Sequence, residues 1–150
     1  MGVFFRYLFK SKGGLVKPEL IISKLDADRL YRLLETLPKG HVMGGSELED
    51  ELDRANLVEP TEIPPNIVSM NSKVKFEVVS TNQEFELTLV YPKDLDQEGK
   101  TISILAPVGS ALLGLSIGDS IEWSSPGGGI LEVIIKDIVY QPERAGELHR

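Results

Sequence analysis

The stretch Lys73-Val-Lys-Phe-Glu-Val78, followed after a short turn by Glu84-Phe-Glu-Leu-Thr-Leu-Val-Tyr91, decides the fold. Apolar and polar residues alternate in both segments, which is the pattern of a β-strand with one buried face. The polar residues 80–83 between them predict a hairpin turn. Further strands are expected at 101–106, 120–124 and 130–140, and a short helix at 108–113. This order predicts an α+β domain with a strongly twisted antiparallel sheet and one short helix.

Upstream of these strands the apolar spacing is helical. Ser23-Lys-Leu-Asp26 and Ser46-Glu-Leu-Glu49 both resemble capping boxes, each followed by leucines at helical spacing. We therefore expect helices at about 24–37 and 46–57. A short connection makes them an antiparallel helical hairpin, or short coiled coil, roughly 20 Å long at about 1.5 Å per residue.

Proline and charge mark the expected boundaries between domains. Residues 59–66 hold three prolines and separate a hairpin at 18–59 from a sheet domain at 66–150. Residues 1–17 carry four cations and no acid, and we expect a loosely ordered leader there. Its apolar run is too short for a signal peptide core or a membrane span, so we expect no membrane contact. The absence of cysteine favours a reducing cytoplasm.

Composition excludes several classes of function. The chain has 150 residues, 41% hydrophobic and 26% charged, which is enough for a buried core. Its net charge of −7 combines the basic leader with twelve cations and twenty-three acids, a net of −11, on residues 18–150. Because such a body is repelled by phosphates, we expect contact with nucleic acid only indirectly, through another protein.

The absence of cysteine removes disulfides, thiolate zinc sites and a cysteine nucleophile. The histidines, His41 and His149, are too few and too far apart for a histidine metal cluster or a serine protease-like triad. The glycines after Pro126 could imitate a phosphate-binding loop, but no Lys-Ser/Thr follows and a hairpin turn is favoured. The sequence therefore predicts no cofactor, no metal site and no small-molecule substrate.

The residues of the sheet domain resemble a known family. Thr101-Ile-Ser-Ile-Leu-Ala-Pro-Val-Gly-Ser-Ala-Leu-Leu-Gly114, Ile117-Gly-Asp119, Ser125-Pro-Gly-Gly128 and Val139-Tyr140 resemble the C-terminal domain of the GreA/GreB transcription elongation factors. Segments 48–57 and 67–76 are more similar to the short-hairpin Rnk members. The resemblance spans about residues 19–146 and implies an FKBP-like domain that docks on RNA polymerase at the rim of its secondary channel.

The resemblance also implies a docking surface. The Gre pattern places an acidic residue, a small residue and a proline before the short helix, and Leu105, Ala106 and Pro107 stand at these positions. Because the acid is replaced by Leu105, we expect a more apolar contact, extended to Val108 and Leu112. A second interpretation is that Pro107 merely starts the helix, where its missing N–H costs nothing.

The hairpin tip departs from the Gre pattern, in which tip carboxylates help to hold a catalytic magnesium ion. The tip at 38–45 contains no Asp or Glu, and its candidate contact residues are Lys39, His41, Val42 and Met43. The acidic run at 47–53 is typical of a solvated helix face. We therefore expect no catalytic residues, and a regulator that binds polymerase and competes with other channel-binding factors without cleaving transcripts. The alternatives are a transcript cleavage factor, an FKBP-like prolyl isomerase by fold analogy, or an interaction domain with another partner.

Overall fold

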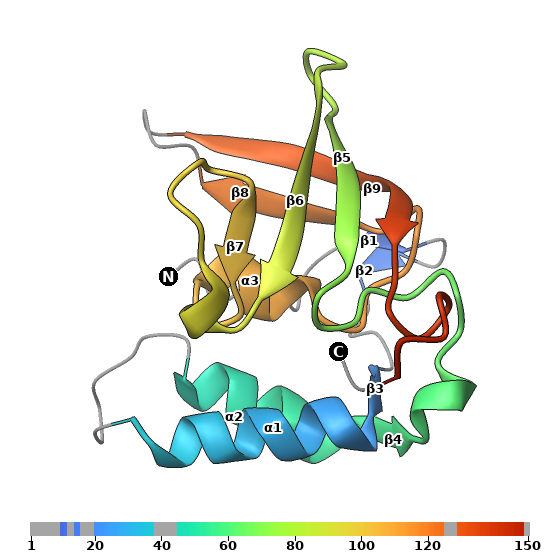
Figure 1. Cartoon of the computed structure of the whole chain (residues 1–150). Helices are drawn as coiled ribbons and strands as arrows, with labels where there is room; N and C mark the ends of the chain where they lie inside the picture. The colour runs from blue at the N-terminus through green and yellow to red at the C-terminus, as the bar shows by residue number, and fades with distance from the viewer. Residues whose placement is uncertain (1–9, 12–13, 16–19, 38–44, 125–128, 149–150) are drawn as a thin grey trace.

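The computed structural model describes residues 10–11, 14–15, 20–37, 45–124 and 129–148. A curled five-stranded sheet lies over a pair of helices, with a short helix against the sheet (Figure 1). The helices are α1 Lys24–Glu35, α2 Gly45–Arg54 and α3 Pro107–Leu112, with single 3-10 turns η2 Pro60–Glu62 and η3 Pro92–Asp94. The strands are β1 Lys10–Ser11, β2 Gly14–Leu15, β3 Ile21–Ser23, β4 Asn56–Val58, β5 Lys73–Val78, β6 Glu84–Val90, β7 Thr101–Ser103, β8 Ser120–Ser124 and β9 Ile130–Tyr140.

The predicted strand pair at the start of the sheet is confirmed. β5 and β6 are antiparallel, with Phe76 opposite Phe85 and their rings stacked at 5.1 Å between centroids. In the turn between them the N–H of Asn82 donates to the carbonyl of Val78. Asn82 has φ 60°, a left-handed conformation that asparagine tolerates better than most residues. The alternating pattern therefore predicted both strands and the turn between them, and the structure adds their register.

The expectation of an all-antiparallel sheet is wrong at one edge. The strand order is β7-β6-β5-β9-β8, and β7 pairs parallel to β6, with Leu89 opposite Ile102. The connection at 91–100 contains η3 and returns to the start of the neighbouring strand instead of turning back on itself. Such a crossover delivers the next strand in the same direction. β7 also ends at Ser103, because residues 104–106 turn into α3.

Helices α1 and α2 pack against each other beneath the sheet (Figure 1). Leu30 from α1 and Leu48 and Leu52 from α2 are completely or almost completely buried, as the leucine spacing predicted. Across the same contact, the Tyr31 hydroxyl donates to Asp53 Oδ1 at 2.6 Å. Residues 38–44 lie outside the described residues, so the hairpin connection stays a prediction.

The second helix is shorter than the spacing predicted. It ends at Arg54 instead of continuing to 57, because Asn56–Val58 forms β4 and pairs parallel with β3. The N–H of Asn56 also donates to the carbonyl of Leu20 at 2.7 Å. β3 leads into α1 and β4 follows α2, so this small sheet joins the two ends of the helix pair.

The buried side chains form one cluster that runs from the helices into the sheet. It includes Ile22, Leu30 and Leu52 from the helical part, and Met70 and Phe76 from the sheet part. The division into units at 18–59 and 66–150 stays a prediction, as does the FKBP-like description of the sheet part. The observed architecture is a mixed α+β fold with a curled sheet and few helices.

Part of the segment expected to be a loosely ordered leader is paired. β1 and β2 are antiparallel, with Lys10 opposite Leu15, and β1 lies next to β8. Among the described residues, no helix combines the length and apolar character that a membrane span needs.

Candidate functional site

The predicted docking residues lie on the short connection from β7 into α3 and on α3 itself. The N–H of Leu105 donates to Ser103 Oγ at 3.0 Å, and the N–H of Ala106 donates to the carbonyl of Ser103 at 3.0 Å. Ala106 is the N-cap of α3 with an extended backbone, and Pro107 is the first helical residue. A proline fits there because the first N–H groups of a helix have no partner within it. Ser103 therefore fixes the path of the connection through both its side chain and its carbonyl.

The structure separates these residues by exposure. Leu105, Ala106 and Val108 are half-buried, so part of each side chain faces solvent. Leu112 is only 1% exposed and belongs to the core. The prediction that Leu112 extends the contact surface therefore needs revision, because its side chain packs inward. The side chain of Pro107 lies outside the described residues.

Gly109 allows α3 to lie directly on the end of β7. A Cβ atom added to Gly109 would sit 1.9 Å from the carbonyl oxygen of Ser103, well inside van der Waals contact. Any other residue would therefore push the helix away from the strand. The close packing of Gly109 on Ser103 and the hydrogen bonds accepted by Ser103 together fix the positions of Leu105 and Val108.

A second group of polar residues lies where α1 meets the sheet part. The N–H of Asp26 donates to Ser23 Oγ at 3.0 Å, which confirms Ser23 as the helix cap. The sequence predicted that the Asp26 carboxyl would complete a capping box. Instead, this carboxyl accepts a hydrogen bond from the N–H of Met70 at 3.2 Å. Asp26 is 2% exposed. It therefore connects the first turn of α1 to the loop before β5.

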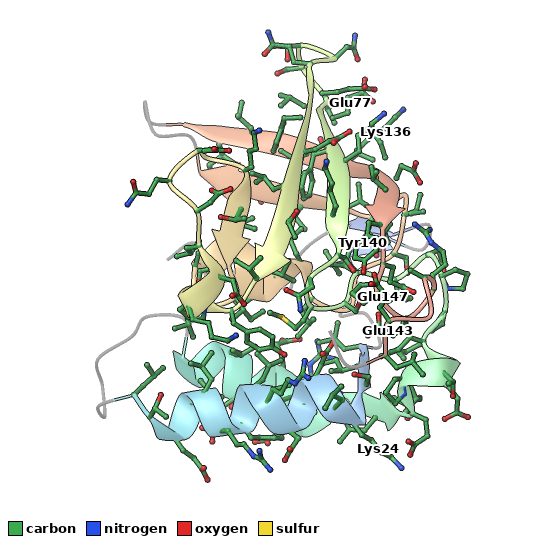
Figure 2. The ribbon with its side chains drawn as sticks, viewed as in Figure 1. Lys24, Glu77, Lys136, Tyr140, Glu143 and Glu147 are labelled. Carbon is green, nitrogen blue, oxygen red and sulfur yellow. The ribbon has the colours of Figure 1, made fainter. Side chains whose placement is uncertain are left out.

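The surroundings of Asp26 make its ionisation unfavourable. Burial raises the pKa of Asp26 to about 7, and the nearby carboxylate of Glu143 adds to the shift. Glu143 Oε1 accepts from Ser69 Oγ at 2.6 Å, so this acid is held beside the same loop. Figure 2 shows Glu143 in the segment after β9, between the sheet and the helices. Burial likewise raises the pKa of Tyr91, whose ring lies close to Asp26 and Arg29.

The acidic face of α2 is mostly solvated, as predicted. Glu49 and Asp50 are exposed, and Asp53 accepts the hydrogen bond of Tyr31. Glu51 is the exception, because it is buried and its Oε1 accepts from Arg54 at 2.6 Å. Within the part of the chain that the structure describes, no three His, Cys, Asp or Glu side chains converge in a way that could hold a metal ion.

The tip candidates Lys39, His41, Val42 and Met43 lie outside the described residues. Leu105, Ala106 and Val108 are half-buried at the start of α3, whereas Leu112 is in the core and the acids of α2 are spread along that helix.

Comparison with known proteins assigns both parts of the chain. The family model described as "Transcription elongation factor, GreA/GreB, C-term" matches residues 63–140, and the one described as "Rnk N-terminus" matches residues 18–58. The chain belongs to the GreA/GreB family, in its Rnk form. It is thus a member of a family of transcription elongation factors and regulators.

Individual members of the GreA/GreB family agree with this assignment. The regulator of nucleoside diphosphate kinase of Escherichia coli strain K12 is 43% identical over 131 residues, which is 87% of this chain and 96% of that protein. Transcription elongation factor GreA of Helicobacter hepaticus is 37% identical over 100 residues, 64% of this chain and 61% of that protein. The solved structure of a GreA/GreB elongation factor from Nitrosomonas europaea superposes with a TM-score of 0.76 at 60% identity, covering 83% of this chain and all of that one.

Three residues that shape this Rnk-type chain escaped the sequence reasoning. Asp26 was assigned to a local cap, although its carboxyl reaches a loop 44 residues away. Ser103 was predicted in a strand, and it is the last residue of β7, but its hydrogen bonds to Leu105 and Ala106 were not predicted. Gly109 did carry a signal, because a glycine in the middle of a short helix is unfavourable unless close packing requires it.

Proposed function

We propose that the chain is a transcription regulator that binds RNA polymerase at the rim of the secondary channel and competes there with other channel-binding factors. In this proposal it acts in the cytoplasm, does not cleave transcripts and meets nucleic acid only through the polymerase. The family assignment supports binding to the polymerase. Binding at the channel rim, competition and the absence of cleavage are argued from the docking connection and from the helix pair. In this proposal the sheet part acts as an FKBP-like docking domain and the helix pair as a short hairpin.

The docking connection supports an apolar protein contact. Leu105 and Val108 are half-buried, and each rests on the core on one side. Their positions are fixed by Ser103 and by the close approach of Gly109, so little order is lost when a partner covers them. An apolar, rigid edge of this kind suits a protein partner better than a nucleic acid.

The helix pair supports occupancy without catalysis, and this observation carries the proposal. At about 1.5 Å per residue, the twelve residues of α1 and the ten of α2 span only about 18 and 15 Å. The sequence between them, Leu37-Pro-Lys-Gly-His-Val-Met-Gly44, contains no carboxylate that could bind a magnesium ion. The nearest acids, Glu35 and Glu47, belong to the helices and not to the connection between them. A pair this short, with no acid in its connection, blocks a channel but brings no metal ligand to a distant active site.

The proposal is tested with core RNA polymerase and backtracked elongation complexes. We expect the chain to co-elute with the polymerase, and to leave the transcripts of backtracked complexes at full length when magnesium is present. It should also slow cleavage by an added GreA or GreB protein in proportion to its concentration. Efficient transcript cleavage by the chain itself would reject the proposal, and so would a failure to bind polymerase.

The docking surface is tested by substitution. Leu105→Asp and Val108→Asp place a charge on the proposed contact, and each should weaken polymerase binding by about tenfold or more. Ile130→Asp is the matched control, because Ile130 is an exposed apolar residue, 51% accessible, at the start of β9. If all three variants bind like the parent chain, the contact lies elsewhere.

A further inference from the structure

A groove of about 1010 Å³ lies between α1 and the sheet part of the chain. One wall is formed by α1, and the other by the end of β6 and by η3. The volume matches the upper limit of the range found for small-molecule sites, about 300–1,000 Å³. None of the residues in the proposed polymerase contact lines it. The groove is therefore a feature separate from the docking surface.

The groove collects positive charge on an otherwise acidic body. Arg29 and Arg32 line it from α1, one turn apart on the same helix face, and Lys93 lines it from η3. Asp94 is the one acid in its lining. Because the cations stand on opposite walls, an anion between them would contact both the helix and the sheet part. Guanidinium groups in particular match the geometry of phosphate oxygens.

All three cations already have neighbours. Arg29 lies close to the buried Asp26 and to Tyr91, whereas the two outer cations form weak pairs with exposed acids. Arg32 lies 3.1 Å from Asp28, and Lys93 lies 3.6 Å from Asp94. The side chains of Arg32 and Lys93 are 75% and 81% exposed. Exposed pairs of this kind contribute little to stability, so a ligand with several charges can replace them.

The rest of the lining is apolar or able to form hydrogen bonds. Leu33, Val90 and Pro92 provide apolar surface, and Thr36 and Thr88 provide hydroxyl groups. The Tyr91 side chain also lines the groove, and its buried hydroxyl has no partner with hydrogen-bond geometry among the described residues. This hydroxyl is closed off from solvent and lies close to Asp26 and Arg29, so it is not a contact for a ligand. The ligand should combine negative charge with a partly apolar body.

We infer that this groove binds a nucleoside polyphosphate, with the phosphates between Arg29, Arg32 and Lys93 and the nucleoside against the apolar wall. A bound nucleotide would join α1 to the sheet part through ion pairs and so hold the helix pair in one orientation. The inference goes beyond the proposed function and stands independently of polymerase binding. An acidic peptide fits less well, because the groove has only three cations in its lining and an apolar wall beside them.

Calorimetric titration of the full chain at physiological ionic strength tests the inference. ATP and GTP are the probes, and adenosine and inorganic tripolyphosphate represent the two halves of the ligand. We expect one saturable site for a nucleoside triphosphate, and binding at least about tenfold weaker for either half alone. The double variant Arg32→Glu/Lys93→Glu should weaken triphosphate binding by at least about tenfold, since it reverses two exposed charges of the groove.

Lys100→Glu is the matched control. Lys100 is 76% exposed and lies 3.5 Å from Glu98, much as Lys93 lies beside Asp94, but it is outside the groove. This variant should bind within about twofold of the parent chain. Thermal unfolding of each variant checks that the fold is intact, which is expected because all three changed residues are exposed.

Two results would overturn the inference. One is the absence of saturable binding for both triphosphates, and the other is unchanged binding in the double variant. Equal affinity for tripolyphosphate and ATP would also overturn it, because the groove would then be a general anion site without a place for the nucleoside. Methyl resonances of Leu33 and Val90 that shift with ATP, while those of Ile130 stay fixed, would support the location.

Discussion

The carboxyl group of Asp26 accepts a hydrogen bond from the backbone N–H of Met70 at 3.2 Å, across the joint between α1 and the loop that leads into β5. Both residues are almost completely buried. The contact fixes the first turn of α1 against the sheet part at a point where a charged group is costly. The joint between α1 and the sheet part therefore contains a buried acid whose charged form is unfavourable.

Asp26→Asn should change how stability depends on pH. The pKa of Asp26 is about 7 in the folded chain, against a usual value of 3.8. Its contribution to folding is therefore complete below about pH 4 and is lost as the pH rises through about 7. Asparagine keeps an oxygen that can accept from Met70 but never ionises. At pH 8 the variant should be more stable than the parent chain by about 1–3 kcal/mol, with little difference near pH 4.

Urea unfolding at a series of pH values measures this effect. Asp28→Asn is the control, because Asp28 is an exposed residue of the same helix and forms a surface pair with Arg32. Its effect should stay within about 0.5 kcal/mol at every pH. A difference between Asp26→Asn and the parent chain that does not vary between pH 4 and pH 8 would show that Asp26 does not titrate in this range.

The sequence predicted the elements whose pattern is local. The alternation at 73–78 and 84–91 predicted β5 and β6, and the leucine spacing predicted that Leu30 and Leu52 would be buried. The resemblance predicted the family from fixed-spacing motifs. These features depend on residues that are close together in the chain, so they can be predicted from the sequence alone.

Features that depend on distant partners were missed. β7 pairs parallel with β6 because the connection at 91–100 is a crossover, and the local sequence of this connection does not indicate its direction. β3 and β4 have three residues each, too few for a periodic signal, and form only because the helix pair brings them together. The role of Asp26 is a third case, since a carboxylate three residues after a serine cap normally serves that cap.

Gly109→Ala should destabilise the chain, although alanine is the better helix former. In a helix without close contacts, the change would stabilise by about 1 kcal/mol. Here the added Cβ would lie 1.9 Å from the carbonyl oxygen of Ser103, so α3 must move away from β7. We expect a loss of about 1–3 kcal/mol in the free energy of unfolding, together with weaker polymerase binding. A stabilised variant would show that α3 is not packed on β7 in this way.

Gly114→Ala tests a different kind of glycine. Gly114 has φ 84°, and an added Cβ would lie 2.9 Å from Leu20 Cδ2, at the entry to the helical part. Gly146 is the matched control, since its φ is 82° and nothing lies within 4 Å of the added atom. Both substitutions incur the backbone strain of about 1–2 kcal/mol.

The excess loss in Gly114→Ala over Gly146→Ala, measured by urea unfolding, then reports the contact with Leu20. A double-mutant cycle with Leu20→Ala should reduce that excess, because the shorter side chain leaves room for the methyl group. Equal losses of stability in the two glycine variants, with no coupling to Leu20→Ala, would show that Gly114 does not pack closely against Leu20.

The pair of Tyr31 and Asp53 tests whether α1 and α2 pack in solution as described. The hydrogen bond to Asp53 is the main reason that the pKa of Tyr31 is raised to about 12, with burial second. A negative carboxylate beside the hydroxyl opposes formation of the phenolate. Asp53→Asn removes that charge and should lower the pKa of Tyr31 by about one unit or more, as followed by NMR of the tyrosine ring carbons. Asp50→Asn changes an exposed acid of the same helix and should leave it nearly unchanged. If Tyr31 titrates identically in the parent chain and in Asp53→Asn, the two helices do not meet through this pair.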